Sequence, residues 1–135
     1  MIIDITSFKQ ATLRLQEILV RYNREPEDLV VQDSVVLRFK YTYELAYKTL
    51  KRFLTATSAN PSEIDAMSFQ DIVRTGNEKG LLKGNVGIWL KYRDKRNITS
   101  QADDSNKAKE VIALAPKFYK EAEYLLDHLS QRNDQ

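Results

Sequence analysis

The feature that most constrains the fold is a run of apolar residues at helical spacing between residues 26 and 55. Its apolar side chains recur three and four positions apart, at Val36, Phe39, Tyr43, Ala46, Leu50 and Phe53. This spacing places them on one stripe of an α-helix, and such a stripe packs against other helices. We therefore predict a long helix from about Pro26 to Thr55, with Tyr43 in the core.

Four further segments show helical periodicity, and glycine and proline fall between these segments or near their ends. We predict helices over about residues 7–22, 68–78 and 88–96, and from about residue 105 past residue 126. Ser68 is expected to cap the third helix and Gly80 to end it. Pro116 is expected to kink the last helix near Ile112. The polar segment 56–66 is predicted to be the main interhelical loop.

These segments predict an all-α protein, and 135 residues suit a single domain over residues 1–135. The chain has no cysteine and one histidine, which excludes a disulfide framework and metal sites built from thiolates or several histidines. No apolar run approaches the roughly 20 residues that span a bilayer, and the first residues lack the pattern of a signal peptide. We expect a cytoplasmic protein that holds no metal.

The net charge of +2 conceals two strongly basic segments. Residues 38–52 hold five basic side chains against one acidic, and residues 72–96 hold seven basic against two acidic. A phosphate-bearing partner would be attracted if the two segments meet in the fold. The alternative is that both are solvated helix faces.

Two stretches carry more than periodicity. Residues 38–51 read R-F-K-Y-T-Y-E-L-A-Y-K-T-L-K, and in residues 80–100 the letters G-L-L and Trp89 precede R-D-K-R-N-I-T-S. Their order and spacing resemble those of the nucleotidyltransferase substrate-binding protein family, a branch of the HEPN superfamily. The resemblance implies a four-helix up-and-down bundle with an additional short helix. It also implies a homodimer.

The same resemblance implies a partner, a separate minimal nucleotidyltransferase in a toxin–antitoxin-like pair. That subunit would supply the catalytic carboxylates, with Mg²⁺ and a nucleoside triphosphate, and this chain would carry no cofactor of its own. The ligand held by this chain would be a nucleotide or RNA.

Ribonuclease members of the superfamily carry an R-x4-6-H motif, in which arginine steadies phosphate charge and histidine moves protons. In this sequence Arg96 and Asn97 are present, but the position matching the histidine is Gln101. An amide has no useful proton affinity, so the motif is degenerate. Asp103 stands where toxin members carry a tyrosine that the partner modifies with AMP. His128 lies far along the chain and is expected at the surface.

We predict a phosphate or substrate site formed by Arg38, Arg93, Arg96, Asn97 and Ser100. On a continuous helix Trp89, Arg93, Arg96 and Ser100 share a face, whereas Arg96 and Gln101 converge only if the helix breaks near Thr99. The alternative is that Arg96 and Asn97 are engaged in hydrogen bonds at a dimer interface.

Tyr41, Tyr47 and Trp89 are predicted to lie at a partner or dimer interface, where amphipathic rings are favoured. Stacking on a base is an alternative for the tyrosines, and burial in the core is one for Trp89. Glu44, between Lys40 and Lys48, is expected in a surface or interhelical ion pair.

Three functions are compatible with these patterns. The first is a binding subunit that positions a phosphate-bearing substrate for a separate nucleotidyltransferase, without catalysis of its own. The second is a metal-independent HEPN endoribonuclease toxin. The third is an antitoxin-like structural partner. Gln101 favours the first over the second, because cleavage through the ribose hydroxyl needs a proton carrier.

Overall fold

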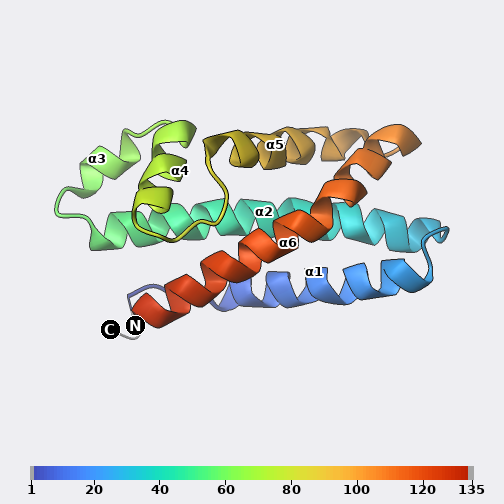
Figure 1. Ribbon diagram of the computed structural model, residues 1–135, viewed down its shortest axis with the longest axis horizontal. Coiled ribbons are helices and arrows are strands. Elements are labelled where there is room, and N and C mark those ends of the chain that lie inside the picture. The colour runs from blue at the N-terminus through green and yellow to red at the C-terminus, as the bar shows by residue number, and fades with distance from the viewer. Residues whose placement is uncertain (1, 134–135) are drawn as a thin grey trace.

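The computed structural model describes residues 2–133, and the regular secondary structure of this range is entirely helical. The four main helices are α1 (Thr6–Arg24), α2 (Leu29–Thr57), α5 (Val86–Asn97) and α6 (Ser105–Asn133). The short helices α3 (Pro61–Asp65) and α4 (Phe69–Glu78) lie between α2 and α5, and the 3-10 helix η1 (Ile98–Gln101) follows α5. Successive main helices run in opposite directions (Figure 1), which confirms the predicted all-α up-and-down bundle.

The central helix is α2, which packs against both α1 and α6. Its predicted apolar stripe is buried throughout, Tyr43 included. The ring of Phe118, from α6, lies 5.2 Å from that of Phe39 and 5.1 Å from that of Tyr92, centroid to centroid, in edge-to-face contacts. Such contacts add to the stabilisation from burial. The aromatic core therefore fixes α5 against α2 and α6.

The beginning of α2 differs from the prediction. The expected first turn at Pro26 is wrong, since the helix begins at Leu29. Asp28 is the N-cap, and its side chain accepts hydrogen bonds from the backbone N–H groups of Val30 and Val31. A carboxylate in this position satisfies donors that the first turn leaves free. The capping side chain, and not the proline, sets the boundary.

The segment 56–66 is also more ordered than predicted, because it contains the short helix α3. Pro61 stands at the first position of that helix, where the missing N–H has no consequence. Ile64 is buried against the core. One apolar anchor and a well-placed proline therefore produce a helical turn in a stretch that reads as a loop.

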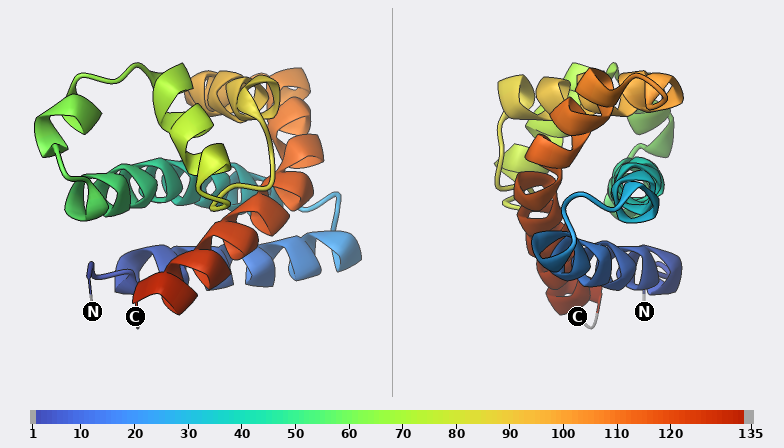
Figure 2. Two further views of the ribbon diagram at one scale, coloured as in Figure 1. Left: turned by 60° about the vertical axis from the view of Figure 1, so that its left-hand side comes forward. Right: turned by 90° about the vertical axis from the view of Figure 1, so that its right-hand side faces the viewer.

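The predicted ends of α4 and the bend of α6 are confirmed. The Ser68 hydroxyl accepts a hydrogen bond from the backbone N–H of Asp71 at 3.1 Å, and Gly80 has a φ of +72° after the helix ends. Only glycine adopts that conformation without strain. Pro116 lies inside α6, and Figure 2 shows the helix changing direction part-way along its length.

A buried carboxylate holds the connection between α4 and α5. Glu121, on α6, is 2% exposed and accepts hydrogen bonds from the backbone N–H groups of Lys83 and Gly84, both at 2.7 Å. Burial raises the pKa of Glu121, and the two backbone hydrogen bonds oppose that rise. A Cβ at position 84 would lie 2.6 Å from a carboxylate oxygen, so this approach requires glycine.

The two ends of the described chain are joined by Asn133. Its side-chain oxygen accepts hydrogen bonds from the backbone N–H groups of Ile2 and Ile3, at 2.7 and 2.9 Å, and its amide donates to the carbonyl oxygen of Ile3 at 2.8 Å. Ile3 is buried. The N-terminal segment is therefore held against the end of α6.

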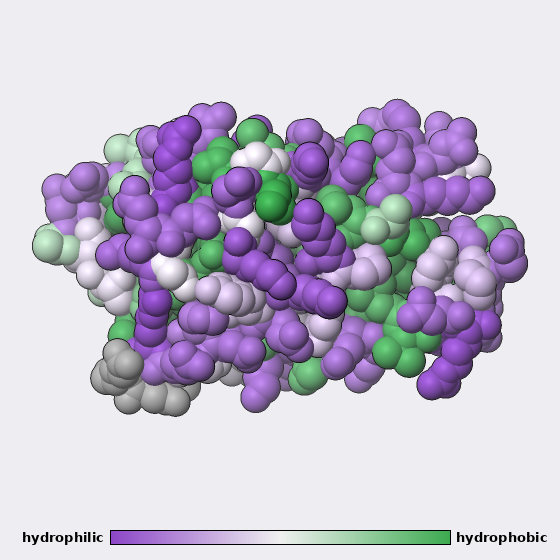
Figure 3. Space-filling view, in the orientation of Figure 1, coloured by the Kyte–Doolittle hydropathy of each residue, from purple (hydrophilic) through white to green (hydrophobic). Residues whose placement is uncertain are grey.

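Hydrophilic residues cover most of the face drawn in Figure 3, and hydrophobic residues gather toward the end of the bundle at which α1 meets α2. The exposed large apolar side chains include Val20 in α1 and Leu29 and Val30 in α2. Within residues 2–133, no helix combines the length and the apolar character needed to cross a membrane.

Candidate functional site

A pocket of about 360 Å³ lies where α2, the start of α4 and α5 meet. Its lining residues are Tyr43, Glu44, Tyr47, Phe69, Arg93, Arg96 and Asn97. Residues 38–52 contribute tyrosines and Glu44 to the pocket but none of their five basic side chains, so its cations, Arg93 and Arg96, both come from the second basic segment. Three of the five predicted phosphate-site residues, all from α5, are among its walls.

Arg96 and Glu44 form an ion pair across the pocket. The Nε and Nη2 groups of Arg96 donate to one carboxylate oxygen of Glu44, at 3.0 and 2.7 Å. The two side chains remain 39% and 42% exposed. The expectation that Glu44 takes part in an ion pair is confirmed, and its partner is the interhelical arginine. Solvent screening limits such a pair to less than about 1 kcal/mol of stability, so its main effect is to orient the guanidinium.

Arg93 lies over an aromatic platform. Its guanidinium carbon is 4.4 Å from the centroid of the Phe69 ring, and the ring of Tyr47 stacks on Phe69 at 5.3 Å with an interplanar angle of 28°. Cations are attracted to the faces of aromatic rings. The half-buried Tyr47 was predicted at an interface, with base stacking as its alternative, and it lies in the pocket wall. Burial raises its pKa, and Arg93 opposes the rise.

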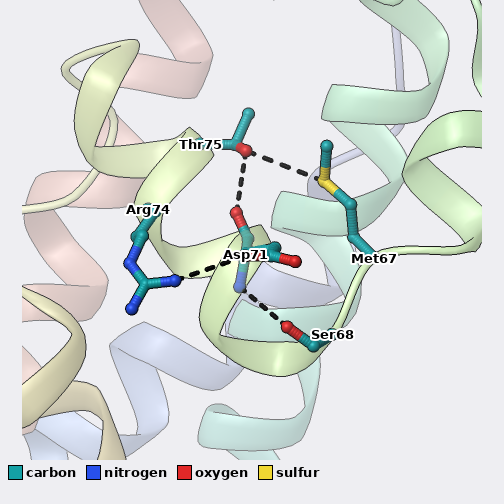
Figure 4. Close-up of polar contacts among 5 residues, drawn as sticks. All are labelled: Met67, Ser68, Asp71, Arg74 and Thr75. Carbon is teal, nitrogen blue, oxygen red and sulfur yellow. Dashed lines mark hydrogen bonds and ion pairs between the residues drawn. The ribbon is translucent and has the colours of Figure 1, made fainter.

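The cap of α4 sets the position of Phe69. Figure 4 shows the Ser68 hydroxyl bonded to the backbone N–H of Asp71, and Arg74 donating to the Asp71 carboxylate at 3.3 Å. The Thr75 hydroxyl donates to the backbone oxygen of Asp71 and approaches the sulfur of Met67. Because Ser68 immediately precedes Phe69, this local network determines where the aromatic platform begins.

The other two residues predicted for the phosphate site lie elsewhere. Arg38 donates to the backbone oxygen of Arg14 at 2.8 Å, which links α2 to α1. Ser100 is exposed within η1 and does not line the pocket. The expectation that both converge with Arg93 and Arg96 is wrong, because one faces the α1 side of the bundle and the other follows the end of α5.

Arg96 and Gln101 were predicted to converge only if the helix breaks near Thr99, and the α-helix does end close to that residue. α5 ends at Asn97 and η1 follows it. Gln101 nevertheless accepts a hydrogen bond from Lys107 and is not among the lining residues of the pocket. Asn97 lines the pocket, and its side-chain oxygen accepts a hydrogen bond from Arg96 at 3.4 Å.

Trp89 has no exposed surface, so the expectation that it lies at a partner interface or shares an open face with Arg93 does not hold. Its ring packs edge-to-face on Tyr92 and Phe118, which realises the alternative of core burial. Tyr41 is half-buried and lies outside the pocket. His128, expected at the surface, is half-buried at the end of α6 and stacks on Tyr124 with 4.0 Å between ring centroids.

The chemistry of the pocket suits anion binding better than proton transfer. Burial raises the pKa of Tyr43, with Arg93 and Arg96 opposing the rise, so this phenol remains protonated at neutral pH. The lining residues include no histidine. Two guanidinium groups, one amide and an aromatic platform can hold a phosphate ester and a base or ring.

Phe69 is a site residue that the sequence did not indicate as functional. A phenylalanine directly after a helix cap is ordinarily a core residue, and only its position opposite Arg93 gives it a role. The Ser68 cap was the one sequence feature that could have helped, since it predicted that α4 begins next to Phe69. Nothing in the sequence connected that helix start with the arginines of α5.

The comparisons with known proteins agree with this geometry. The family model described as "Nucleotidyltransferase substrate binding protein like" matches residues 3–131. The chain belongs to this family. A Haemophilus influenzae protein named "Probable ribonuclease HepT" is 40% identical over 108 residues, which cover 77% of this chain and 73% of the relative.

Two solved structures share the fold. One, from Haemophilus influenzae, is described as the fold of a substrate-binding domain of a nucleotidyltransferase; it is 30% identical, with a TM-score of 0.86 over 94% of this chain and 99% of its own. The other, from Thermus thermophilus, is 24% identical, with a TM-score of 0.73 over 90% of this chain and 98% of its own. The second likeness concerns the fold alone.

Proposed function

We propose that this chain binds a phosphate-bearing substrate for a separate nucleotidyltransferase and that the pocket of Arg93 and Arg96 is the binding site. The observation that carries the proposal is that two guanidinium groups line one pocket, that of Arg93 over the platform of Phe69 and Tyr47 and that of Arg96 beside Glu44. A guanidinium offers a planar fork to phosphate oxygens. The rings offer a surface on which a base can stack.

The weakness of the Arg96–Glu44 ion pair would allow a ligand to replace Glu44 on Arg96. Both side chains are partly exposed, and the pair contributes little to stability. A phosphate oxygen can therefore replace the Glu44 carboxylate on Arg96 at small cost. In the absence of ligand, Glu44 keeps the guanidinium oriented toward the pocket.

The role of the chain is to position a substrate and not to make or break bonds. The residue matching the proton-carrying histidine of ribonuclease members is Gln101, which contacts Lys107 outside the pocket. Asp103 lacks the hydroxyl that AMP modification would require. The catalytic carboxylates, Mg²⁺ and the nucleoside triphosphate belong to the partner subunit, and the two proteins act as a toxin–antitoxin-like pair in the cytoplasm.

Exposed apolar residues on α2 support a homodimer. Leu29 and Leu37 are 71% and 59% exposed, and Leu37 lines a groove of about 390 Å³ together with Asp33 and Lys40. A two-fold axis near Leu37 that related two antiparallel copies of α2 would bring Asp33 of one copy near Lys40 of the other. An isologous interface needs this self-complementarity. Tyr41 is one helical turn beyond Leu37, and residues at this spacing are neighbours on a helix surface.

Ribonuclease activity is the second candidate, because the 40% identical relative is named for it. Incubation with labelled single-stranded RNA distinguishes substrate binding from ribonuclease activity. The proteins compared are the purified unmodified protein, Gln101→His and the neighbouring control Ser100→His. We expect intact RNA with the unmodified protein. Cleavage by the unmodified protein that is lost in Arg96→Gln would replace substrate binding by ribonuclease activity.

Co-expression with the product of the neighbouring open reading frame tests the partner. A stable complex with a nucleotidyltransferase, recovered by size-exclusion chromatography, is the expected result. The measured mass also reports the homodimer. Recovery of the chain alone, as a monomer, would contradict both the complex with a nucleotidyltransferase and the homodimer.

A further inference from the structure

A second basic groove lies along α2, beyond the pocket of Arg93 and Arg96. It has a volume of about 460 Å³ and lies between α2, α3 and the N-terminal segment. Its lining residues are Ile3, Lys48, Lys51, Arg52, Thr55, Ala56 and Asp65. We call it the Lys51 groove. Neither the family description nor the named relatives assign it a role.

The cations of the Lys51 groove are available to a ligand. Across residues 2–133, Lys48, Lys51 and Arg52 take part in no ion pair, whereas Arg96 and Lys95 are each paired with a glutamate. Lys48 and Arg52 are exposed and Lys51 is half-buried. Asp65 is the acidic residue in the lining, so the groove keeps a net positive charge. Such a surface attracts anions.

The walls of the groove are held in place. Asn133 fixes the backbone of Ile3 through two hydrogen bonds of 2.8 and 2.9 Å and that of the neighbouring Ile2 through one of 2.7 Å. Thr55 donates its hydroxyl to the backbone oxygen of Lys51 at 2.8 Å. The groove is therefore formed without a ligand, which lowers the cost of binding one.

The Lys51 groove continues the pocket along one side of α2. Lys48 follows Glu44 by four residues and Lys51 follows Tyr47 by four, and residues at this spacing are neighbours on a helix surface. Arg52 follows Glu44 by eight residues, which is about 12 Å along the helix axis. On the opposite wall, Asp65 borders the groove and Phe69 borders the pocket. The two hollows share no lining residue, but these spacings place them next to each other along α2.

We propose that the Lys51 groove is a second phosphate-binding subsite for the ligand held by Arg93 and Arg96, and that this ligand is a single-stranded nucleic acid. The inference rests on the proposed function of the pocket. One phosphate cannot reach both hollows, but successive phosphates of one chain can. Cations that follow a backbone beside rings that stack on bases are the combination that binds single strands. An acidic peptide would use the cations but not the platform of Tyr47 and Phe69.

The test uses fluorescein-labelled oligouridylates of about 2 to about 10 nucleotides and measures their affinity by anisotropy at several salt concentrations. The groove variant is Lys48→Gln with Lys51→Gln and Arg52→Gln. The charge-matched control is Arg24→Gln with Lys79→Gln and Lys109→Gln, three exposed positions elsewhere. The pocket variant is Arg93→Gln with Arg96→Gln. Circular dichroism melting confirms that each variant is folded.

We expect affinity to rise with length for the unmodified protein. The groove variant should lose about tenfold for the longest oligonucleotide and little for the dinucleotide, and the slope of log affinity against log salt should become shallower by about 2. The control should keep both values within about twofold of the unmodified protein.

Three results would overturn the inference. If the groove variant and the control lose affinity equally while the pocket variant binds no oligonucleotide, the Lys51 groove is not a subsite and the pocket still binds phosphate. If the pocket variant binds every length as well as the unmodified protein does, or if no length binds, the proposed function fails and the subsite fails with it. If a polyglutamate peptide displaces the longest oligonucleotide at equal concentration, the groove binds acidic protein segments instead.

Discussion

Two glutamates join distant segments of this protein in opposite surroundings. Glu121 is 2% exposed, and its two oxygens accept the backbone N–H groups of Lys83 and Gly84. Glu44 is 42% exposed and accepts two guanidinium N–H groups of Arg96 on one oxygen. The buried carboxylate of Glu121 stabilises the fold, whereas a ligand can replace the exposed carboxylate of Glu44 on Arg96.

Burial decides which of these contacts is structural and which is functional. Removing the partner of a buried polar group leaves a desolvated donor or acceptor, which costs far more than the net gain of an ordinary hydrogen bond. Removing one half of an exposed ion pair leaves a group that water can solvate. The surroundings of Glu121 and Glu44 therefore predict different consequences for the same substitution.

The largest expected effect is on stability. Glu121→Ala leaves the N–H groups of Lys83 and Gly84 without an acceptor and should lower the free energy of unfolding by about 3 kcal/mol. Glu44→Ala should lower it by less than about 1 kcal/mol. Chemical denaturation at pH 7 measures both values. Equal losses for the two variants would remove the distinction between a structural and an exchangeable carboxylate.

The next effect is on ligand affinity. Arg93→Gln with Arg96→Gln removes both guanidinium forks and should weaken nucleotide binding by about a hundredfold or more, since charged hydrogen bonds contribute about 1.5–3 kcal/mol each. The free energy of unfolding should fall by no more than about 1 kcal/mol. Arg74→Gln with Lys79→Gln is the charge-matched control, because both side chains are exposed and lie outside the pocket. Isothermal titration calorimetry gives the affinities. A control that weakens binding equally would show that overall charge, and not the pocket, attracts the ligand.

A smaller effect of opposite sign is expected at Glu44. Glu44→Gln removes the carboxylate that competes with phosphate for Arg96, so nucleotide binding should strengthen by about threefold. Glu17→Gln, an exposed position on α1, controls for the change in net charge. Weaker binding in Glu44→Gln alone would mean that Glu44 contacts the ligand directly and is not its competitor.

The smallest effect is a dependence of stability on pH. The pKa of Glu121 is raised in the folded protein, so this carboxyl binds its proton more tightly there than in the unfolded chain. Its contribution to stability is therefore full below the ordinary pKa of glutamate and declines as pH rises through the folded value. The difference in unfolding free energy between the unmodified protein and Glu121→Gln should decrease over that window. A difference that increases with pH would contradict the raised pKa.

The helical framework was predictable because its signals are local. The apolar stripe of α2, the Ser68 cap and Pro116 each act within a few residues of their own position. The stripe is buried, Ser68 caps α4, and α6 changes direction part-way along its length (Figure 2). The boundary at Asp28 and the helix α3 were missed. In both cases a single side chain, the Asp28 carboxylate or the buried Ile64, outweighs the general polarity of the segment.

The site was predictable only where its residues share one helix. Arg93, Arg96 and Asn97 lie on α5 and were identified together, but Arg38 and Ser100 depend on how other segments meet α5, and both lie elsewhere. Glu121 was not identified from the sequence at all, because its partners are backbone N–H groups that no sequence pattern reveals. Most of what could not be predicted depends on contacts between segments that are distant in the chain.

One anisotropy measurement tests most directly whether the pocket binds a nucleic acid without cutting it. Labelled single-stranded RNA is titrated with the unmodified protein and with Arg93→Gln plus Arg96→Gln, and each signal is followed for hours after mixing. We predict a saturable rise that stays constant with time for the unmodified protein and is absent for the variant. A rise that decays as the RNA is cut, or an equal rise with the variant, would contradict substrate binding at Arg93 and Arg96.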